Sequence, residues 1–139
     1  MPNKIKDILK KKKNRKIVCL TAYSKNISKI LDKYCDIILV GDSLASVLYG
    51  MKNTHNISVD TIIKHSVSVK KGIKKSLMVV DMPRGSYDNP LQAKKNAKLI
   101  MKKTKCDAVK IESNNKNFKE IKDITKSRIP VMGHIGYTP

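Results

Sequence analysis

The chain has 139 residues, 40% hydrophobic and only 4% aromatic, which predicts a single globular domain over residues 1–139 with an aliphatic core. No run of about 18 apolar residues could span a bilayer, and the Lys-rich start lacks the apolar stretch of a secretory signal, so we expect a cytoplasmic protein with no membrane partner. Cys19, Cys35 and Cys106 lack Cys-x-x-Cys spacing, which argues against a disulfide framework or a zinc site and predicts buried thiols.

The net charge of +19 is the strongest compositional signal, and it raises the hypothesis of a basic nucleic-acid-binding module. Only Arg15, Arg84 and Arg128 among the 30 basic residues are arginine, although the guanidinium group is the usual reader of bases and phosphates. Lysine also recurs along nearly every segment instead of forming a patch. We therefore favour a solvated lysine surface and expect no specific nucleic-acid partner.

The predicted elements begin with a helix over residues 5–12, which would act as a lid or cap before the first strand. Five short, nearly unbroken apolar runs then predict buried strands at residues 17–21, 37–40, 77–81, 108–111 and 130–133. Such runs are typical of parallel strands that are covered on both faces.

Four apolar stripes with helical spacing lie between these strands, at residues 27–31, 59–70, 93–101 and 118–124. Ser58 or Asp60 would begin the second of these helices, and Asn89-Pro90 the third. Alternating strands and helices leave two topologies, an open doubly wound sheet or a (β/α) barrel. A complete eight-unit barrel takes about 250 residues, so the barrel alternative would be truncated before closure.

Polar residues follow several strands at the ends where parallel α/β folds place their active sites. Asp42 and Ser43 follow the second strand, Asp81 ends the third, and the fourth carries Lys110 and Glu112, which point to the same side because strand side chains alternate. Asp42, Asp81 and Glu112 could therefore converge from three neighbouring strands.

Three carboxylates that meet without a counter-ion repel one another, so this set predicts a hard cation such as Mg²⁺. Mg²⁺ leaves coordination positions for a bidentate ligand such as a 2-oxo acid, and Lys110 would offer a positive charge to its carboxylate. Each residue also has a structural alternative: Asp42 as a helix cap, Asp81 in a turn, and Lys110 with Glu112 as a surface ion pair.

The histidines give a weaker signal. His134, after the fifth strand, could donate a hydrogen bond, carry a proton or be a satisfied loop residue. His55 and His65 have no partner at metal-ligand spacing, and we expect them to be structural or exposed.

Four segments, residues 20–23, 40–44, 110–112 and 133–139, carry motifs that match one known family in order and spacing. They read Leu-Thr-Ala-Tyr, Val-Gly-Asp-Ser-Leu, Lys-Ile-Glu and Gly-His-Ile-Gly-Tyr-Thr-Pro, and they resemble the signatures of ketopantoate hydroxymethyltransferase. The resemblance covers about residues 5–139, and it implies the amino-terminal half of a (β/α)8 TIM-type barrel with about five parallel strands.

The resemblance also implies an activity: transfer of a hydroxymethyl group from methylenetetrahydrofolate, the co-substrate, to 3-methyl-2-oxobutanoate, giving 2-dehydropantoate in pantothenate biosynthesis. The family pattern assigns Mg²⁺ to Asp42, Asp81 and Glu112, and oxo acid binding to Asp42, Ser43, Asp81 and Lys110. It assigns the general base to a glutamate beyond Pro139, which leaves His134 as an auxiliary catalytic candidate in this sequence.

Three alternatives remain beside the transferase. One is another Mg²⁺-dependent 2-oxo acid barrel, a lyase of the isocitrate lyase and phosphoenolpyruvate mutase type. The others are the nucleic-acid-binding module and an inactive half that only assembles with barrel partners. An open half barrel would expose strand edges, so we expect a homo-oligomer or association with a completing half, whether the sequence is a truncated copy or a natural half.

Overall fold

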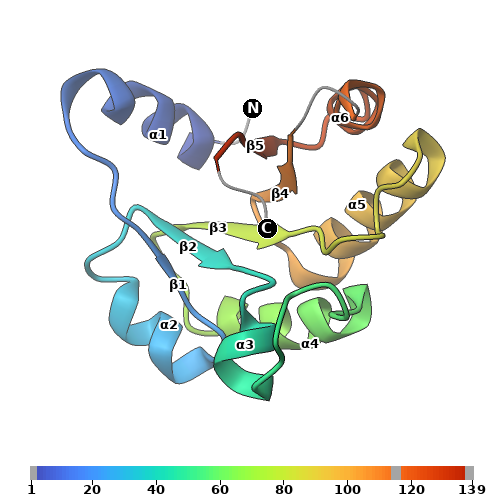
Figure 1. Cartoon of the computed structure of the whole chain (residues 1–139). Helices are drawn as coiled ribbons and strands as arrows, with labels where there is room; N and C mark the ends of the chain where they lie inside the picture. Colours follow the sequence, from blue (N-terminus) through green and yellow to red (C-terminus); the bar gives the residue numbers. More distant parts are fainter. Residues whose placement is uncertain (1–2, 114–116, 137–139) are drawn as a thin grey trace.

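The computed structural model describes residues 3–113 and 117–136, and it shows strands and helices in alternation (Figure 1). The strands are β1 (Cys19–Thr21), β2 (Ile37–Val40), β3 (Leu77–Asp81), β4 (Ala108–Glu112) and β5 (Val131–His134). The helices are α1 (Asn3–Asn14), α2 (Lys25–Leu31), α3 (Leu44–Tyr49), α4 (Val59–Lys70), α5 (Pro90–Thr104) and α6 (Phe118–Lys126). All five predicted strands and five predicted helices are therefore confirmed, whereas α3 was not predicted.

The five strands form one parallel sheet in the order β1-β2-β3-β4-β5, so each strand pairs with the next one in the sequence. Helices α2, α4, α5 and α6 follow one another around one face of this sheet (Figure 1), and neighbouring members of the series contact each other. Helix α1 lies on the opposite face. With both faces covered, the strands can consist of nearly continuous apolar residues, as the sequence indicated.

Strand alternation divides the core into two layers. Ile38, Val40, Met78, Val80 and Val109 point toward the helices α2 to α6 and belong to the larger buried cluster. The intervening strand residues point to the other face, where the cluster of Ile37, Leu77, Val79 and Ala108 packs against Ile5 and Ile8 of α1. The predicted role of the first helix as a cap is thereby explained: its apolar side covers the inner face of the sheet.

Helix starts follow the predicted capping chemistry. The Ser58 hydroxyl accepts a hydrogen bond from the Thr61 N–H at 3.1 Å, and the Asn89 side chain accepts one from the Gln92 N–H at 2.9 Å. Pro90 occupies the first turn of α5, where its missing N–H is tolerated. Helix α3 escaped prediction because it has only six residues, too few to show a helical stripe.

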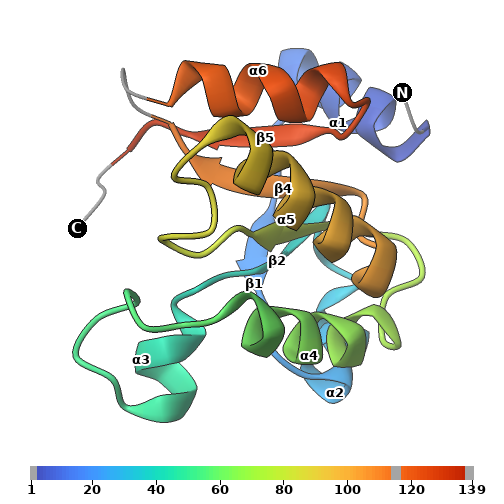
Figure 2. The same cartoon turned by 90° about the vertical axis from the view of Figure 1, so that its right-hand side faces the viewer.

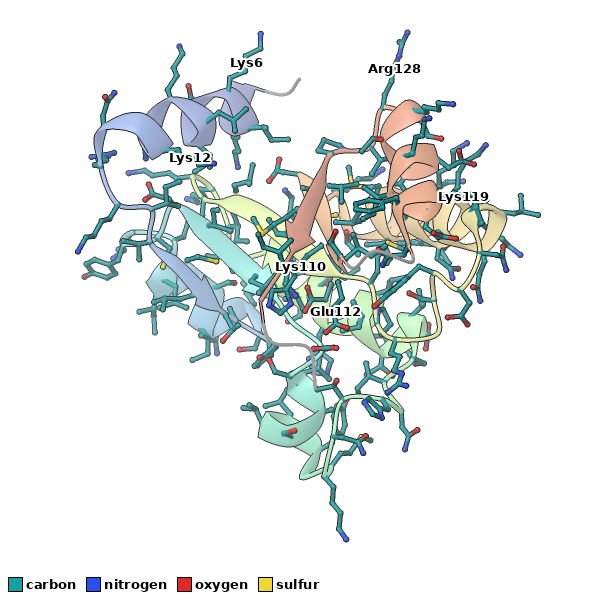
Figure 3. All side chains as sticks on the ribbon, turned by 45° about the horizontal axis from the view of Figure 1, so that its top comes forward. Lys6, Lys12, Lys110, Glu112, Lys119 and Arg128 are labelled. Atoms are coloured by element: carbon teal, nitrogen blue, oxygen red, sulfur yellow. The ribbon has the colours of Figure 1, made fainter. Side chains whose placement is uncertain are left out.

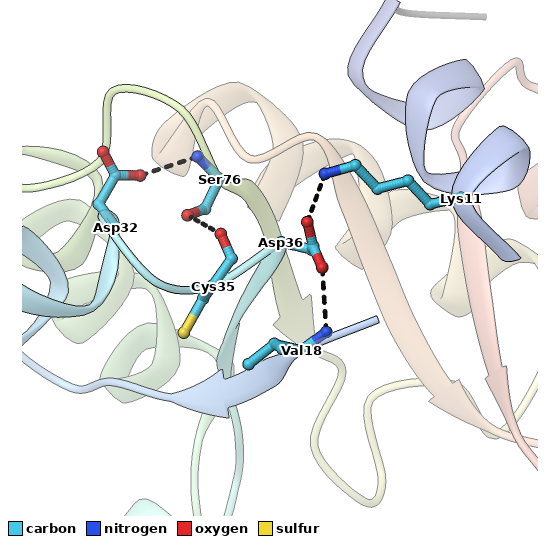
Figure 4. A network of polar contacts seen from close by, with 6 residues as sticks. All are labelled: Lys11, Val18, Asp32, Cys35, Asp36 and Ser76. Atoms are coloured by element: carbon cyan, nitrogen blue, oxygen red, sulfur yellow. Dashed lines mark hydrogen bonds and ion pairs between the residues drawn. The ribbon is translucent and has the colours of Figure 1, made fainter. Parts of the chain in front are cut away.

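The amino end of the sheet is fastened by Asp32, which lies just after α2 and is only 7% exposed (Figure 4). Its carboxylate accepts hydrogen bonds of 2.8 to 3.1 Å from the backbone N–H groups of Lys74, Lys75 and Ser76. Burial by itself would raise the pKa of Asp32, but these N–H groups outweigh it and hold the pKa below the ordinary value of 3.8. The contact ties the end of α2 to the start of β3.

A second aspartate, Asp36, fastens α1 to the same end. Its carboxylate forms an ion pair with Lys11 and accepts a hydrogen bond from the Val18 N–H at 3.0 Å (Figure 4). The Lys11 hydrogen bond, followed by the Val18 N–H, lowers the pKa of Asp36 below 3.8. Lys4 adds a third link, since its ammonium donates to the Ser76 carbonyl at 2.9 Å.

The three cysteines are free thiols. Cys35 and Cys106 are buried as predicted, but Cys19 is exposed, and that prediction was wrong. The reason is its position: β1 lies at the edge of the described sheet and pairs only with β2, so all three residues of β1 are exposed. Within the described ranges, no helix is long and apolar enough to cross a membrane.

Candidate functional site

The sheet places the polar strand residues on one face and at one end. Asp81 follows Leu77 and Val79 with the alternation of β3, so it lies on the inner face, as do Lys110 and Glu112 of β4. The register pairs Asp81 with Lys110 and Glu112 with His134. Figure 3 shows Lys110 and Glu112 near the centre of the molecule, whereas Lys6 and Arg128 extend outward from its periphery.

Asp81 and Lys110 form the centre of this group. The Lys110 ammonium lies 2.7 Å from one Asp81 carboxylate oxygen, and the two side chains are only 17% and 5% exposed. The other oxygen accepts a hydrogen bond of 3.1 Å from the Asp42 N–H. Gly41 permits this approach, because a Cβ atom at this position would lie 3.3 Å from the same Asp81 oxygen. Lys110 is thus paired with Asp81 instead of the surface pair with Glu112 that was one alternative.

The charge on Asp81 is only partly compensated by these partners. Burial raises the pKa of Asp81 above its ordinary value of 3.8, although Lys110 and the Asp42 N–H both act to lower it. A carboxylate held in this way gains from any further positive charge placed beside it. Perturbed carboxylates of this kind, at the carboxyl ends of parallel strands, are typical of functional sites.

Ser43, the residue after Asp42, is bound by a tyrosine. Its side chain makes no cap bond to α3, and its hydroxyl lies 2.7 Å from the hydroxyl of Tyr23, which is half-buried in the segment after β1. Figure 2 shows α3 and the loop between β3 and α5 at the same end of the molecule. The Ser43 hydroxyl therefore has a fixed partner beside Asp42.

The pKa of Tyr87, in the loop between β3 and α5, is raised by burial and by nearby carboxylates. Burial raises its pKa to about 12, and the negative charges of Glu112, Asp42 and Asp81 add to the shift. The phenol is consequently neutral over the physiological range. Neither Tyr23 nor Tyr87 was predicted as a site residue; their positions just after β1 and β3 were the available signal.

The three carboxylates do not form a closed metal cage. Over residues 3–113 and 117–136, no group of three or more His, Cys, Asp or Glu side chains is close enough to hold a metal ion. Mg²⁺, however, usually binds through one or two carboxylates and keeps several waters. The oxygen-only chemistry and the partly compensated charge of Asp81 next to Asp42 fit such an ion, and Glu112 lies on the same face of the sheet.

His134 lies opposite Glu112 in the β4–β5 pair. Its Nδ1 atom is enclosed and has no hydrogen-bond partner among the described residues, and its ring packs so closely on Gly136 that a Cβ atom there would lie 2.9 Å from Nε2. An enclosed nitrogen without a partner is unfavourable, so a ligand or water that supplied one would be stabilised. The auxiliary role of His134 stays a prediction.

The described hydrogen bonds of His55 and His65 go to residues outside the predicted site set. His55 is exposed, with its Nε2 atom 2.7 Å from a guanidinium nitrogen of Arg84. His65 is half-buried on α4 and makes two hydrogen bonds. Tyr137, Thr138 and Pro139 of the fourth sequence motif lie outside the described residues.

The architecture and the site define a parallel α/β protein of the barrel type with a carboxylate-rich end. Two solved structures share the fold. A phosphonopyruvate hydrolase in complex with oxalate and Mg²⁺ has a TM-score of 0.75 and 12% identity over 96% of this chain and 52% of that one. A 2,3-dimethylmalate lyase of the phosphoenolpyruvate mutase and isocitrate lyase superfamily has a TM-score of 0.70 and 12% identity over 94% of this chain and 52% of that one. The predicted barrel-type fold is thus confirmed, and identities this low speak for the fold alone.

Sequence similarity identifies the family. Residues 2–139 match the ketopantoate hydroxymethyltransferase family, and the chain belongs to it. It is 54% identical over its whole length to 3-methyl-2-oxobutanoate hydroxymethyltransferase of Pelagibacter ubique, covering 54% of that protein, and 47% identical to the enzyme of Anaplasma marginale over 97% of this chain and 49% of that one. The chain therefore spans about half the length of the curated relatives it matches.

Proposed function

We propose that this chain forms the Mg²⁺ and 2-oxo acid site of a hydroxymethyltransferase that passes a one-carbon unit from methylenetetrahydrofolate to 3-methyl-2-oxobutanoate, giving 2-dehydropantoate for pantothenate synthesis. One observation carries the proposal: buried Asp81, bound by Lys110 and the Asp42 N–H, lies at the carboxyl end of the sheet of a family member. The substrate and the reaction are those of the family's relatives, which are named 3-methyl-2-oxobutanoate hydroxymethyltransferase.

The Mg²⁺ part of the proposal assigns the ion to Asp42 and Asp81, with Glu112 binding directly or through water. When bound, Mg²⁺ would supply positive charge that stabilises the negative charge developing on the keto oxygen of the substrate. The raised pKa of Asp81 supports this assignment, since a neighbouring cation would favour its charged form.

The other site residues would bind and orient the oxo acid. The Lys110 ammonium offers a positive charge to the substrate carboxylate, and the Ser43 hydroxyl, held by Tyr23 at 2.7 Å, offers a directed hydrogen bond. Asp42 and Asp81 complete the substrate-binding set. Burial of Asp81 keeps water from screening these charges. In the same proposal His134 assists proton movement through its Nδ1 atom, which has no partner among the residues that the structure describes.

The proposal extends to partners and location. Strands β1 and β5 are the edges of the described sheet, and an apolar pocket that includes Ile5, Leu9, Ile129 and Val131 opens beside β5. Such edges favour a second copy or a completing half of the barrel. A cytoplasmic location belongs to the proposal because three free thiols suit a reducing compartment.

Calorimetric titration of the purified chain with 3-methyl-2-oxobutanoate, with and without Mg²⁺, tests the proposal. The wild-type chain should bind saturably only with Mg²⁺, and Asp81→Asn should weaken this binding at least about tenfold. Asp60→Asn is the matched control, because Asp60 is exposed on α4 and pairs only with Lys64 in the described chain. Binding is measured instead of turnover because the chain spans about half the length of its relatives.

A folded chain that gives no heat, or binding that ignores Mg²⁺ and Asp81, would refute the proposed site. The lyase alternative predicts the same dependence on Mg²⁺ and Asp81, so a second titration with a tetrahydrofolate in the presence of the oxo acid separates the two. Binding of the folate favours the transferase.

A further inference from the structure

His65 on α4 links two segments that surround Ser43. Its Nδ1 atom lies 2.9 Å from the backbone carbonyl oxygen of Tyr23, and its Nε2 atom lies 3.0 Å from the Tyr49 hydroxyl. The ring also packs edge-on against the Tyr49 ring, with centroids 5.9 Å apart and planes at 86°. His65 therefore contacts both the segment after β1 and the last residue of α3.

The hydrogen-bonding partners fix the proton on the ring. A carbonyl oxygen can only accept, so Nδ1 must carry the hydrogen that is donated to Tyr23. In the neutral imidazole Nε2 is then the acceptor, and the Tyr49 hydroxyl donates to it.

Both contacts lead to Ser43. Tyr23, held at its carbonyl by His65, places its hydroxyl 2.7 Å from the Ser43 hydroxyl. Ser43 also precedes the first residue of α3, and Tyr49, the last residue of that helix, is held by the same imidazole. His65 thus holds the tyrosine that contacts Ser43 and the far end of the short helix that Ser43 begins.

Core packing does not account for His65. The buried stripe of α4 consists of Ile62, Ser66 and Val69, and His65 lies beside this stripe, half-buried. Its two described hydrogen bonds, to Tyr23 and to Tyr49, both connect it to segments that flank the proposed oxo acid site.

We infer that His65 is a positioning residue for oxo acid binding, which fixes Tyr23 and α3 so that the Ser43 hydroxyl keeps one direction. The inference rests on the proposed function. It assigns His65 no contact with the substrate or with Mg²⁺. Its effect passes through the Tyr23 hydroxyl and through α3.

Variants of His65 separate the two contacts. The side-chain amide of His65→Asn can replace the Nδ1 donor but not the Nε2 acceptor, while His65→Leu removes both. We expect His65→Leu to weaken Mg²⁺-dependent binding of 3-methyl-2-oxobutanoate about tenfold and His65→Asn about threefold, as losing two or one hydrogen bonds implies. His55→Leu, an exposed histidine away from the site, is the matched control and should bind like wild type.

A double-variant cycle tests the route. Because Tyr23→Phe removes the hydroxyl through which His65 acts on Ser43, adding His65→Leu to it should weaken binding by a clearly smaller factor than His65→Leu does alone. Nitrogen-15 NMR of the wild-type chain, which does not depend on binding, should show His65 protonated on Nδ1.

The outcomes are distinct. A wild-type chain that binds no oxo acid overturns the proposed function and this inference together. Wild-type binding that is unchanged in both folded His65 variants overturns the inference alone, as does additivity in the cycle or a neutral His65 that carries its proton on Nε2 alone. Circular dichroism confirms folding of each variant, and His65→Asn keeps the test available where His65→Leu does not fold.

Discussion

Asp81 at the carboxyl end of the sheet and Asp32 at its amino end are both buried carboxylates, 4% and 7% exposed, but their pKa values move in opposite directions. Asp32 receives hydrogen bonds from three backbone N–H groups, which outweigh its burial. Asp81 has one ammonium and one backbone N–H, which do not. The difference indicates that the amino end is built for stability, whereas the carboxyl end holds charge that a ligand could compensate.

The largest expected effect is at Asp32. Asp32→Ala would leave the N–H groups of Lys74, Lys75 and Ser76 without their acceptor, and the free energy of unfolding should fall by about 3 kcal/mol. Urea denaturation followed by circular dichroism measures this change. Asp32→Asn, which keeps one acceptor oxygen, should lose less. Equal stability of wild type and Asp32→Ala would contradict the claim that Asp32 stabilises the amino end of the sheet.

At the carboxyl end of the sheet, the double variant Asp81→Asn with Lys110→Met should not lower the free energy of unfolding. Removing both charges of a buried ion pair also removes the cost of desolvating them, and Asn keeps an acceptor for the Asp42 N–H, so the free energy of unfolding should stay the same or rise by up to about 2 kcal/mol. The same denaturation experiment measures it. Lys110→Met alone is the control, since it leaves Asp81 without its cation and should destabilise the chain. A large loss in the double variant would show that the pair is needed for folding.

The pH dependence should differ as well. Asp32 and Asp36 have lowered pKa values, so their contribution to stability is full above the ordinary aspartate value of about 3.9 and is lost as pH falls toward the folded-state values. Asp81, with a raised pKa, contributes with the opposite sign: its contribution is present below the ordinary value and is lost as pH rises through the folded-state value.

Denaturation between pH 7 and pH 2 tests this difference. Asp36→Asn should lose less stability on acidification than wild type, because the contact with Lys11 no longer depends on a charged carboxylate. An acid profile of Asp36→Asn that superimposes on that of wild type would contradict the assignment.

The smallest effect is expected at the exposed pair of Asp60 and Lys64 on α4. The ammonium and carboxylate lie 2.7 Å apart, but both side chains are more than 70% exposed. Solvent and salt screen such pairs, so Lys64→Gln should leave the denaturation midpoint unchanged within error. A measurable shift of the midpoint would mean that an exposed ion pair stabilises this chain without being buried.

The sheet was largely predictable because the apolar runs of a parallel sheet are local signals. Four helices were predicted from apolar stripes, and the helix at residues 5–12 was predicted before the first strand. The six residues of α3 are too few to show an apolar stripe. The position of Asp81, Lys110 and Glu112 on one face followed from strand alternation, and Asp42 was predicted just after the second strand. The pairing of Lys110 with Asp81 did not, because register between strands is set by packing that a single sequence does not display.

The roles of Asp32 and His65 were also invisible in the sequence. Asp32 binds backbone N–H groups more than 40 positions along the chain, and His65 binds a backbone carbonyl 42 positions away. Backbone groups carry no sequence signature, so only the folded arrangement reveals such partners.

The identity of sheet order and chain order has a consequence for biosynthesis. Each strand docks against the strand made just before it, so the sheet can grow in one direction while the chain leaves the ribosome. No early strand has to wait for a distant later one, which keeps the loops closed at each step short. At every stage the strand just made forms one edge of the sheet and β1 the other, and the next strand of the chain pairs with the newer edge.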